Sequence, residues 1–211
     1  MTLRLLIATT NPAKAERLRR LCDGLDLELV DGPSLGGEPS TEEQGASHLA
    51  NAVRKAVDWS RRHREAAIAS DGGLVIPALG DGWKSLLTRR ATGGAVSDEE
   101  HANRLLARMR ELSDERRAGY WAEALAVARD GTVVGAWETN GLHGRIAEEY
   151  APRQGVSGFW VSGLWASPDG RRYAKLEDNE LAAIGDPWAV LAEPVRDLLM
   201  RLALVSQARE G

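Results

Sequence analysis

The chain has 211 residues, of which 43% are apolar and 27% charged, with a formal net charge of −4. This balance excludes a collagen-like or disordered chain, and no apolar run approaches the roughly 20 residues of a membrane-spanning helix. An acidic chain is also a poor general nucleic-acid binder, because such binding needs a basic surface. Cys22 is the only cysteine, so no internal disulfide can form, and we expect a cytoplasmic protein without membrane association.

Apolar patterning predicts strands and helices that alternate in the first half of the chain and a hairpin later. We expect strands at 3–8, 25–30 and 66–70, helices at 12–22, 41–65, 97–112 and 188–206, and a hairpin of 117–128 with 132–139. Turns are expected at 71–73 and, within the hairpin, at Asp130-Gly131, and Ser97 is expected to cap the helix 97–112. This order predicts an α/β fold with a mixed twisted central sheet, flanking helices and two lobes around a cleft, all within one domain, 1–211.

The first candidate site is the polar turn between the first strand and the first helix, Thr9-Thr10-Asn11-Pro12-Ala13-Lys14. Asn11 and Pro12 suit the cap and first position of a helix. A helix N-terminus offers N–H groups and a positive dipole end to an anion. Lys14 lies in the first turn, where helices prefer acidic residues, and a nearby phosphate would explain it. An ordinary cap with an exposed lysine is the alternative.

The second candidate is Asp71, which follows the strand 66–70 in a Gly-rich turn. Open α/β sheets bind ligands at the carboxyl ends of their strands, so Asp71 could hold Mg²⁺ or activate a water. An aspartate bonded to its own turn backbone is the alternative. The third candidate is Glu42-Glu43-Gln44-Gly45 with Asn51 and Lys55 on the next helix, and a solvated helix start with a surface lysine is the alternative. The four histidines show no metal-ligand spacing.

Three segments occur in an order and spacing that resembles a known family. They are Ala8 to Lys14, then Glu43-Gln44-Gly45 with Asn51-Ala52 and Lys55-Ala56, then Ile68 to Leu74. Together they resemble the inosine/xanthosine triphosphate pyrophosphatases, and the resemblance spans nearly the whole chain. It implies a two-lobed mixed α/β fold, Mg²⁺-dependent hydrolysis of a nucleoside triphosphate to the monophosphate and pyrophosphate, and a homodimer.

The resemblance also implies roles for individual residues. Asp71 and Lys14 would be catalytic, and Glu43 and Asp71 would hold the metal. The substrate would contact a larger set: Thr9, Thr10, Asn11, Lys14, Lys55, Gly72 and Arg89 on the phosphate side, and Phe159, Trp160, Ser162 and Asp186 on the base side. Trp160 could stack on a flat base, with a place in the core as the alternative.

The chain departs from the family pattern mainly on the base side. Ser70 stands where the family has a first aspartate before Asp71, and Asp186-Pro187 replaces a His-Arg pair that reads the purine oxygens. Three hypotheses follow: a nucleoside-triphosphate pyrophosphatase with an altered base pocket, a house-cleaning inosine/xanthosine triphosphate pyrophosphatase with unchanged specificity, or a non-catalytic nucleotide-binding or partner-binding relative. The retained lysines and carboxylates favour an enzyme.

Overall fold

A computed structural model describes residues 2–36, 45–87, 96–152 and 160–208. The chain divides into two compact units, each assembled from separate stretches of sequence. Unit 1 comprises Met1–Asp71, Glu123–Thr139 and Leu191–Gly211, and unit 2 comprises Gly72–Ala122 and Asn140–Val190. These units agree with the two lobes expected from the sequence.

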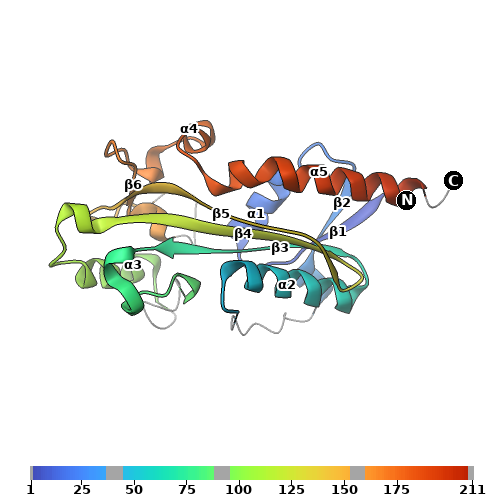
Figure 1. The fold of residues 1–211 in the computed structure, drawn as a ribbon, viewed down its shortest axis with the longest axis horizontal. Helices are drawn as coiled ribbons and strands as arrows, with labels where there is room; N and C mark the ends of the chain where they lie inside the picture. Colours follow the sequence, from blue (N-terminus) through green and yellow to red (C-terminus); the bar gives the residue numbers. More distant parts are fainter. Residues whose placement is uncertain (1, 37–44, 88–95, 153–159, 209–211) are drawn as a thin grey trace. The chain divides into compact units, whose positions relative to one another are not determined.

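Six strands form one mixed sheet in the order β2-β1-β3-β4-β5-β6 (Figure 1). The strands are β1 Leu3–Ile7, β2 Leu27–Asp31, β3 Ala66–Val75, β4 Ala118–Arg129, β5 Thr132–Ile146 and β6 Trp165–Ala166. The helices are α1 Pro12–Leu21, α2 His48–His63, α3 Asp98–Arg108, α4 Asp178–Ala183 and α5 Pro187–Ala208. Strand β1 runs parallel to β2 and β3, whereas β6 runs antiparallel to β5. The predicted mixed α/β sheet is therefore confirmed.

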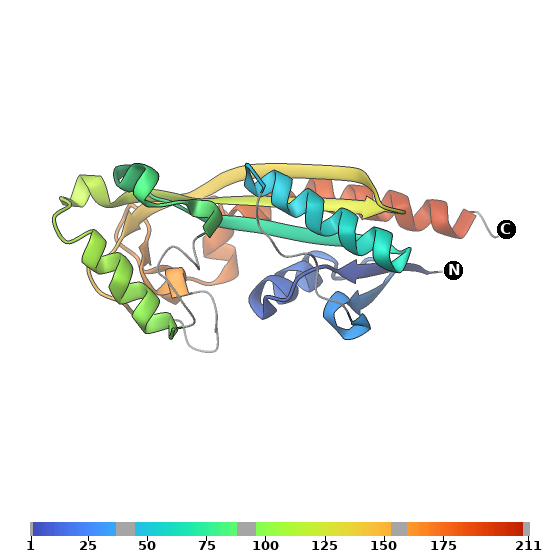
Figure 2. The same ribbon diagram turned by 90° about the horizontal axis from the view of Figure 1, so that it is seen from below.

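Alternating alanines on the strands of unit 1 allow helix α2 to pack closely against one sheet face. Ala67 and Ala69 of β3 and Ala124 and Ala126 of β4 share a buried cluster with Trp59 of α2. Helices α2 and α5 lie on opposite sides of the strands (Figures 1 and 2). On the α5 side, the Arg196 guanidinium donates a hydrogen bond of 2.7 Å to the carbonyl of Leu21, at the end of α1.

Unit 2 has a core rich in tryptophan. The Trp160 ring stacks on His101 of α3 at 5.7 Å and meets the ring of Trp83 edge-on at 6.5 Å. The buried Arg117 side chain donates hydrogen bonds to three backbone carbonyls, those of Met109, Ile146 and Ala147. These bonds satisfy the polar head of a side chain that would otherwise be costly to bury.

Several predicted boundaries are confirmed by the local geometry. Asn11 caps α1 and Ser97 caps α3, the latter accepting a hydrogen bond from the Glu100 N–H at 3.1 Å. The hairpin of β4 and β5 turns at Asp130 and Gly131, whose φ values of 50° and 71° suit a two-residue turn with left-handed residues. No helix in the described part of the chain is long and apolar enough to cross a bilayer.

Two boundary predictions were wrong. Helix α2 begins at His48 rather than near residue 41, because Ser47 caps it by accepting from the Ala50 N–H at 3.1 Å; residues 41–44 lie outside the described residues. The expected turn at 71–73 is also absent from the described chain, since β3 continues through it to Val75. β1 pairs with β3 at Ala66–Ile68, before this segment, so β4, the other neighbour of β3, is the strand that accommodates the two glycines in extended backbone.

Candidate active site

Asp71 of β3 is the centre of a buried polar cluster in unit 1 and is 4% exposed. One carboxylate oxygen accepts a hydrogen bond from Lys55 Nζ at 2.6 Å. The other lies 2.7 Å from His48 Nδ1 and 3.4 Å from Asn51 Nδ2. On α2, Asn51 and Lys55 follow His48 by three and seven residues. The helix therefore presents all three side chains on one face, toward Asp71.

The surroundings of Asp71 keep it ionised. Burial by itself raises the pKa of this carboxyl, but the hydrogen bond from His48 and the charges of Lys14 and Lys55 outweigh burial and hold the pKa well below its usual range. A carboxylate of such low basicity is a weak proton acceptor. The geometry therefore suits Asp71 to hold a cation or orient a water rather than to take up a proton for long.

Asn51 connects Asp71 to the backbone that precedes α2. The Gly45 N–H donates to Asn51 Oδ1 at 2.9 Å, and the Asn51 side chain is fully buried. A Cβ atom at position 45 would lie 2.4 Å from Asn51 Oδ1, so the close approach requires glycine. Glu43, the other expected metal ligand, precedes Gly45 by two positions and lies outside the described residues.

At the start of α1, the backbone N–H groups already have partners. Asn11 Oδ1 accepts from the N–H groups of Ala13 at 2.9 Å and Lys14 at 3.2 Å, and the Asn11 N–H donates to Thr9 Oγ1 at 3.1 Å. Pro12 has no N–H to offer. The expected free donors are thus taken by the Asn11 cap, and the Lys14 side chain is the group best suited to meet an anion here.

Sequence reasoning missed two residues of this cluster, His48 and Glu123. Glu123 of β4 is 1% exposed, and its Oε1 lies 3.9 Å from Lys14 Nζ. The signal for Glu123 was a single charged residue inside the apolar run 121–128. The signal for His48 is its helical spacing from Asn51 and Lys55, which a search for metal-ligand spacing does not detect.

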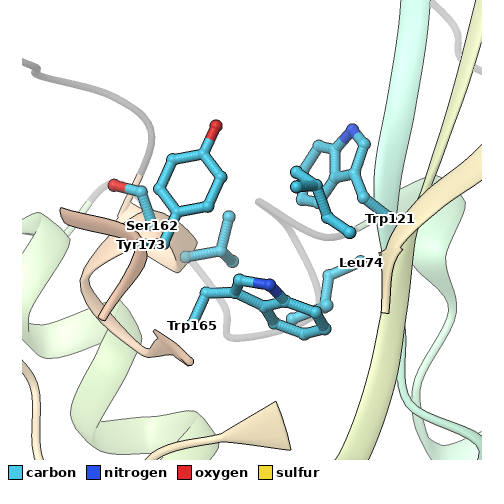
Figure 3. A pocket seen from close by; sticks show the side chains of 7 residues that line it. Leu74, Trp121, Ser162, Trp165 and Tyr173 are labelled. Carbon is cyan, nitrogen blue, oxygen red and sulfur yellow. The ribbon is translucent and has the colours of Figure 1, made fainter. Parts of the chain in front are cut away.

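The described base-side residues Trp160, Ser162 and Asp186 lie in unit 2. Phe159 and Arg89 lie outside the described residues. Trp160 is buried against His101. Ser162 lines a small apolar cavity with Leu74, Trp121, Trp165 and Tyr173 (Figure 3). Asp186 Oδ1 accepts from the Trp188 N–H at 3.2 Å at the beginning of α5. Three expected phosphate-side residues lie elsewhere. Gly72 follows Asp71 in β3, and Thr9 and Thr10 lie in the turn before α1, where Thr10 is exposed.

The cluster fits a divalent cation only in part. Within the described ranges, no group of three or more His, Cys, Asp or Glu side chains could hold a metal ion. Mg²⁺, however, is commonly bound by one or two carboxylates and completed by water and substrate phosphates. The ionised Asp71 carboxylate fits an ion that arrives with a phosphorylated ligand, rather than one held in a cage made of protein alone.

The site combines the buried Asp71 carboxylate with the charges of two lysines, on a mixed sheet covered by helices. This class of α/β site is suited to bind a phosphorylated ligand. The chain belongs to the Ham1 family, whose sequence profile matches residues 5–185. It is 35% identical to the dITP/XTP pyrophosphatase of Anaeromyxobacter sp. (strain Fw109-5), over 98% of this chain and 99% of that one.

Solved structures agree with this assignment. A dITP/XTP pyrophosphatase from Mycobacterium abscessus superimposes with a TM-score of 0.69 at 28% identity, covering 90% of this chain and 97% of that one. The HAM1 protein of Coxiella burnetii superimposes with a TM-score of 0.72, covering 98% and 99%. At 22% identity the second match shows the shared fold alone.

Proposed function

We propose that this chain hydrolyses a nucleoside triphosphate to the monophosphate and pyrophosphate. The observation that carries the proposal is Asp71, buried and ionised, with Lys55 Nζ at 2.6 Å and the charge of Lys14 acting on it. A relative that is 35% identical over nearly the full length is a dITP/XTP pyrophosphatase, which supports the same class of reaction. The enzyme is a hydrolase that acts on phosphoanhydride bonds.

Lysines and turn residues bind the triphosphate in this proposal. Lys14 and Lys55 each carry an ammonium with three donors, and the turn Thr9-Thr10-Asn11 lies directly before Lys14. Arg89 would add a further cation, and Gly72, which follows Asp71 in β3, would contact the substrate. These groups offset the charge of the phosphate oxygens and hold the scissile bond in one orientation, which is most of what phosphoryl transfer requires.

Asp71 orients the attacking water in this proposal. His48 and Asn51 fix one carboxylate oxygen, so the carboxylate cannot rotate freely when the water binds. Asp71 and Glu43 would hold Mg²⁺, which when bound neutralises negative charge on the phosphate oxygens. Expulsion of pyrophosphate then leaves the monophosphate in the site.

Base recognition differs from the family pattern in this proposal. Asp186 caps α5, and Pro187 after it has no N–H, so neither offers a donor to a purine oxygen. Phe159 and Ser162 would contact the base through an aromatic ring and a hydroxyl group, whereas the Trp160 ring, buried against His101 and Trp83, fits the alternative of a place in the core. Unchanged preference for inosine or xanthosine triphosphate is the second candidate, and the names of the relatives favour it.

A nucleotide panel tests both candidates. We would measure kcat/KM for inosine, xanthosine, adenosine, guanosine and cytidine triphosphates with Mg²⁺, following pyrophosphate and phosphate separately. Pyrophosphate release without strong preference for inosine triphosphate supports an altered base pocket, and a hundredfold preference, about 2.7 kcal/mol, supports unchanged specificity. Asp71→Asn should reduce turnover by about 10² or more. Absence of pyrophosphate with every nucleotide would contradict the proposed enzyme.

The proposal extends to the domain organisation, oligomeric state and cellular compartment of the enzyme. We propose that the whole chain acts as one pyrophosphatase-like domain, as a homodimer, and in the cytoplasm without membrane or nucleic-acid partners. The family resemblance supports the dimer, and the single cysteine is compatible with a reducing compartment. Size-exclusion chromatography with light scattering tests the dimer by its mass.

A further inference from the structure

Glu123 is an unusual residue for its position in the sheet. It lies in β4 within the stretch 121–128, in which every residue is buried. Its neighbours Ala124 and Ala126 face α2, so the alternation of a strand directs Glu123 to the opposite face, where α1 packs. A carboxylate is costly to bury there unless a cation compensates its charge.

Lys14 of α1 supplies that cation. Its Nζ lies 3.9 Å from Glu123 Oε1, which is within ion-pair range but longer than a hydrogen bond. The ammonium therefore keeps donors for other acceptors while the charge of Glu123 attracts it. Helix α1 has no acidic residue in its first turn, so Glu123 also provides the negative charge that this turn lacks beside Lys14.

Ser70 adds an independent observation on the same face. Ala67 and Ala69 of β3 face α2, so Ser70 points toward the α1 side, as Glu123 does. The Ser70 side chain is 1% exposed, and its Oγ has no hydrogen-bond partner among the described residues. A buried hydroxyl without a partner is unfavourable, and the oxygen of a bound ligand or its water would complete it.

We propose that Glu123 is a positioning residue that fixes the Lys14 ammonium for the triphosphate. This inference rests on the proposed function and adds the residue that prepares its phosphate site. The two lysines and the two buried carboxylates, Asp71 and Glu123, balance in charge before substrate binds. A similar device operates in protein kinases, where a glutamate from another element holds the phosphate-binding lysine in place.

The sign of the change in affinity distinguishes positioning from simple repulsion. Glu123→Gln removes one negative charge near the anion, so repulsion alone would tighten triphosphate binding. Positioning predicts the reverse: the Kd for inorganic triphosphate, measured by calorimetry with Mg²⁺, rises about tenfold. Glu123→Asp keeps the charge but is shorter by one methylene, and it should lose affinity partially. Because that conservative variant keeps the charge, it serves as the test if Glu123→Gln does not fold.

A double-mutant cycle with Lys14 provides the second readout. If Glu123 acts through Lys14, adding Glu123→Gln to Lys14→Gln should change the Kd less than twofold. Glu28→Gln is the matched control, since Glu28 is exposed on β2 and pairs with Arg4, and its Kd should match that of the wild type. Each variant is checked for its melting temperature, so that loss of fold is separated from loss of binding.

The outcomes separate the two proposals. Unchanged or tighter binding by Glu123→Gln, wild-type binding by Glu123→Asp, or an undiminished effect of Glu123→Gln in the Lys14→Gln background would overturn the positioning role. If the wild-type protein nevertheless binds inorganic triphosphate and hydrolyses a nucleotide, the proposed function stands and only the positioning role of Glu123 is overturned. A wild-type protein that does neither would overturn both.

Discussion

His48 Nδ1 lies 2.7 Å from Asp71 Oδ2, and both side chains are buried in unit 1. An ionised carboxylate only accepts hydrogen bonds, so Nδ1 carries the proton and donates it. This contact joins the first residue of α2 to β3. It holds Oδ2 of the Asp71 carboxylate, whereas Lys55 binds the other oxygen, Oδ1. It also makes His48 part of the candidate site.

Replacement of His48 by leucine should weaken catalysis. The variant removes the donor to Asp71 Oδ2 and frees the carboxylate to rotate, so kcat/KM should fall on the order of tenfold, about 1.4 kcal/mol. Loss of the hydrogen bond also raises the pKa of Asp71, so the acid limb of the pH–activity profile should move to higher pH. His143→Leu, at an exposed position, is the control. A His48→Leu profile that coincides with the wild type at every pH would contradict this role.

Replacement of Gly45 by alanine should disturb Asp71 through Asn51. The new Cβ would lie 2.4 Å from Asn51 Oδ1 and 3.1 Å from its backbone nitrogen, so the Asn51 side chain must move away from the site. We expect reduced kcat/KM with a small loss of stability, measured by turnover and thermal melting. Gly82→Ala is the matched control, because a Cβ there meets no atom within 4 Å. Equal activity of the two variants would argue against the Asn51 connection.

Lys14→Ala should weaken nucleotide binding and also lower stability. From the sequence alone, loss of a lysine at a helix N-terminus is expected to leave the apo protein as stable as before. The structure reverses that expectation, because the substitution leaves the buried Glu123 carboxylate without its Lys14 partner. We expect a loss on the order of 1–3 kcal/mol in urea unfolding. A Lys14→Ala/Glu123→Gln double variant should recover much of that loss, and a double variant no more stable than Lys14→Ala would contradict the pairing.

Cys22 should react slowly with thiol reagents while the protein is folded. Burial raises the pKa of its thiol to about 12, so the nucleophilic thiolate is scarce at neutral pH. Because the folded pKa exceeds the unfolded value, Cys22 contributes stability that is fully present below about pH 8.5 and is lost as pH rises toward 12. Labelling with and without denaturant measures this difference, and Cys22→Ser is the control for the pH dependence. Rapid labelling of the folded protein at pH 7 would contradict the burial of the thiol.

Local features of the sequence were sufficient to predict much of the fold and part of the site. The Asn11-Pro12 cap, the Ser97 cap and the Asp130-Gly131 turn each depend on hydrogen bonds or backbone angles within a few residues. Lys55 and Asp71 were identified by their residue types within motifs, and the structure joins them directly.

Only the tertiary structure decided the contacts between segments that are distant in the sequence. Glu123 is 109 positions from Lys14, and nothing local to either residue predicts that β4 and α1 bring them within 3.9 Å. The continuation of β3 through Asp71 and its two glycines was likewise decided by its neighbour β4, because β1 pairs with β3 at Ala66–Ile68, before this segment, and glycine permits both a turn and an extended strand. The charge state of Asp71 follows from the same cause: burial, His48 and the two lysines act on it together only after the chain has folded.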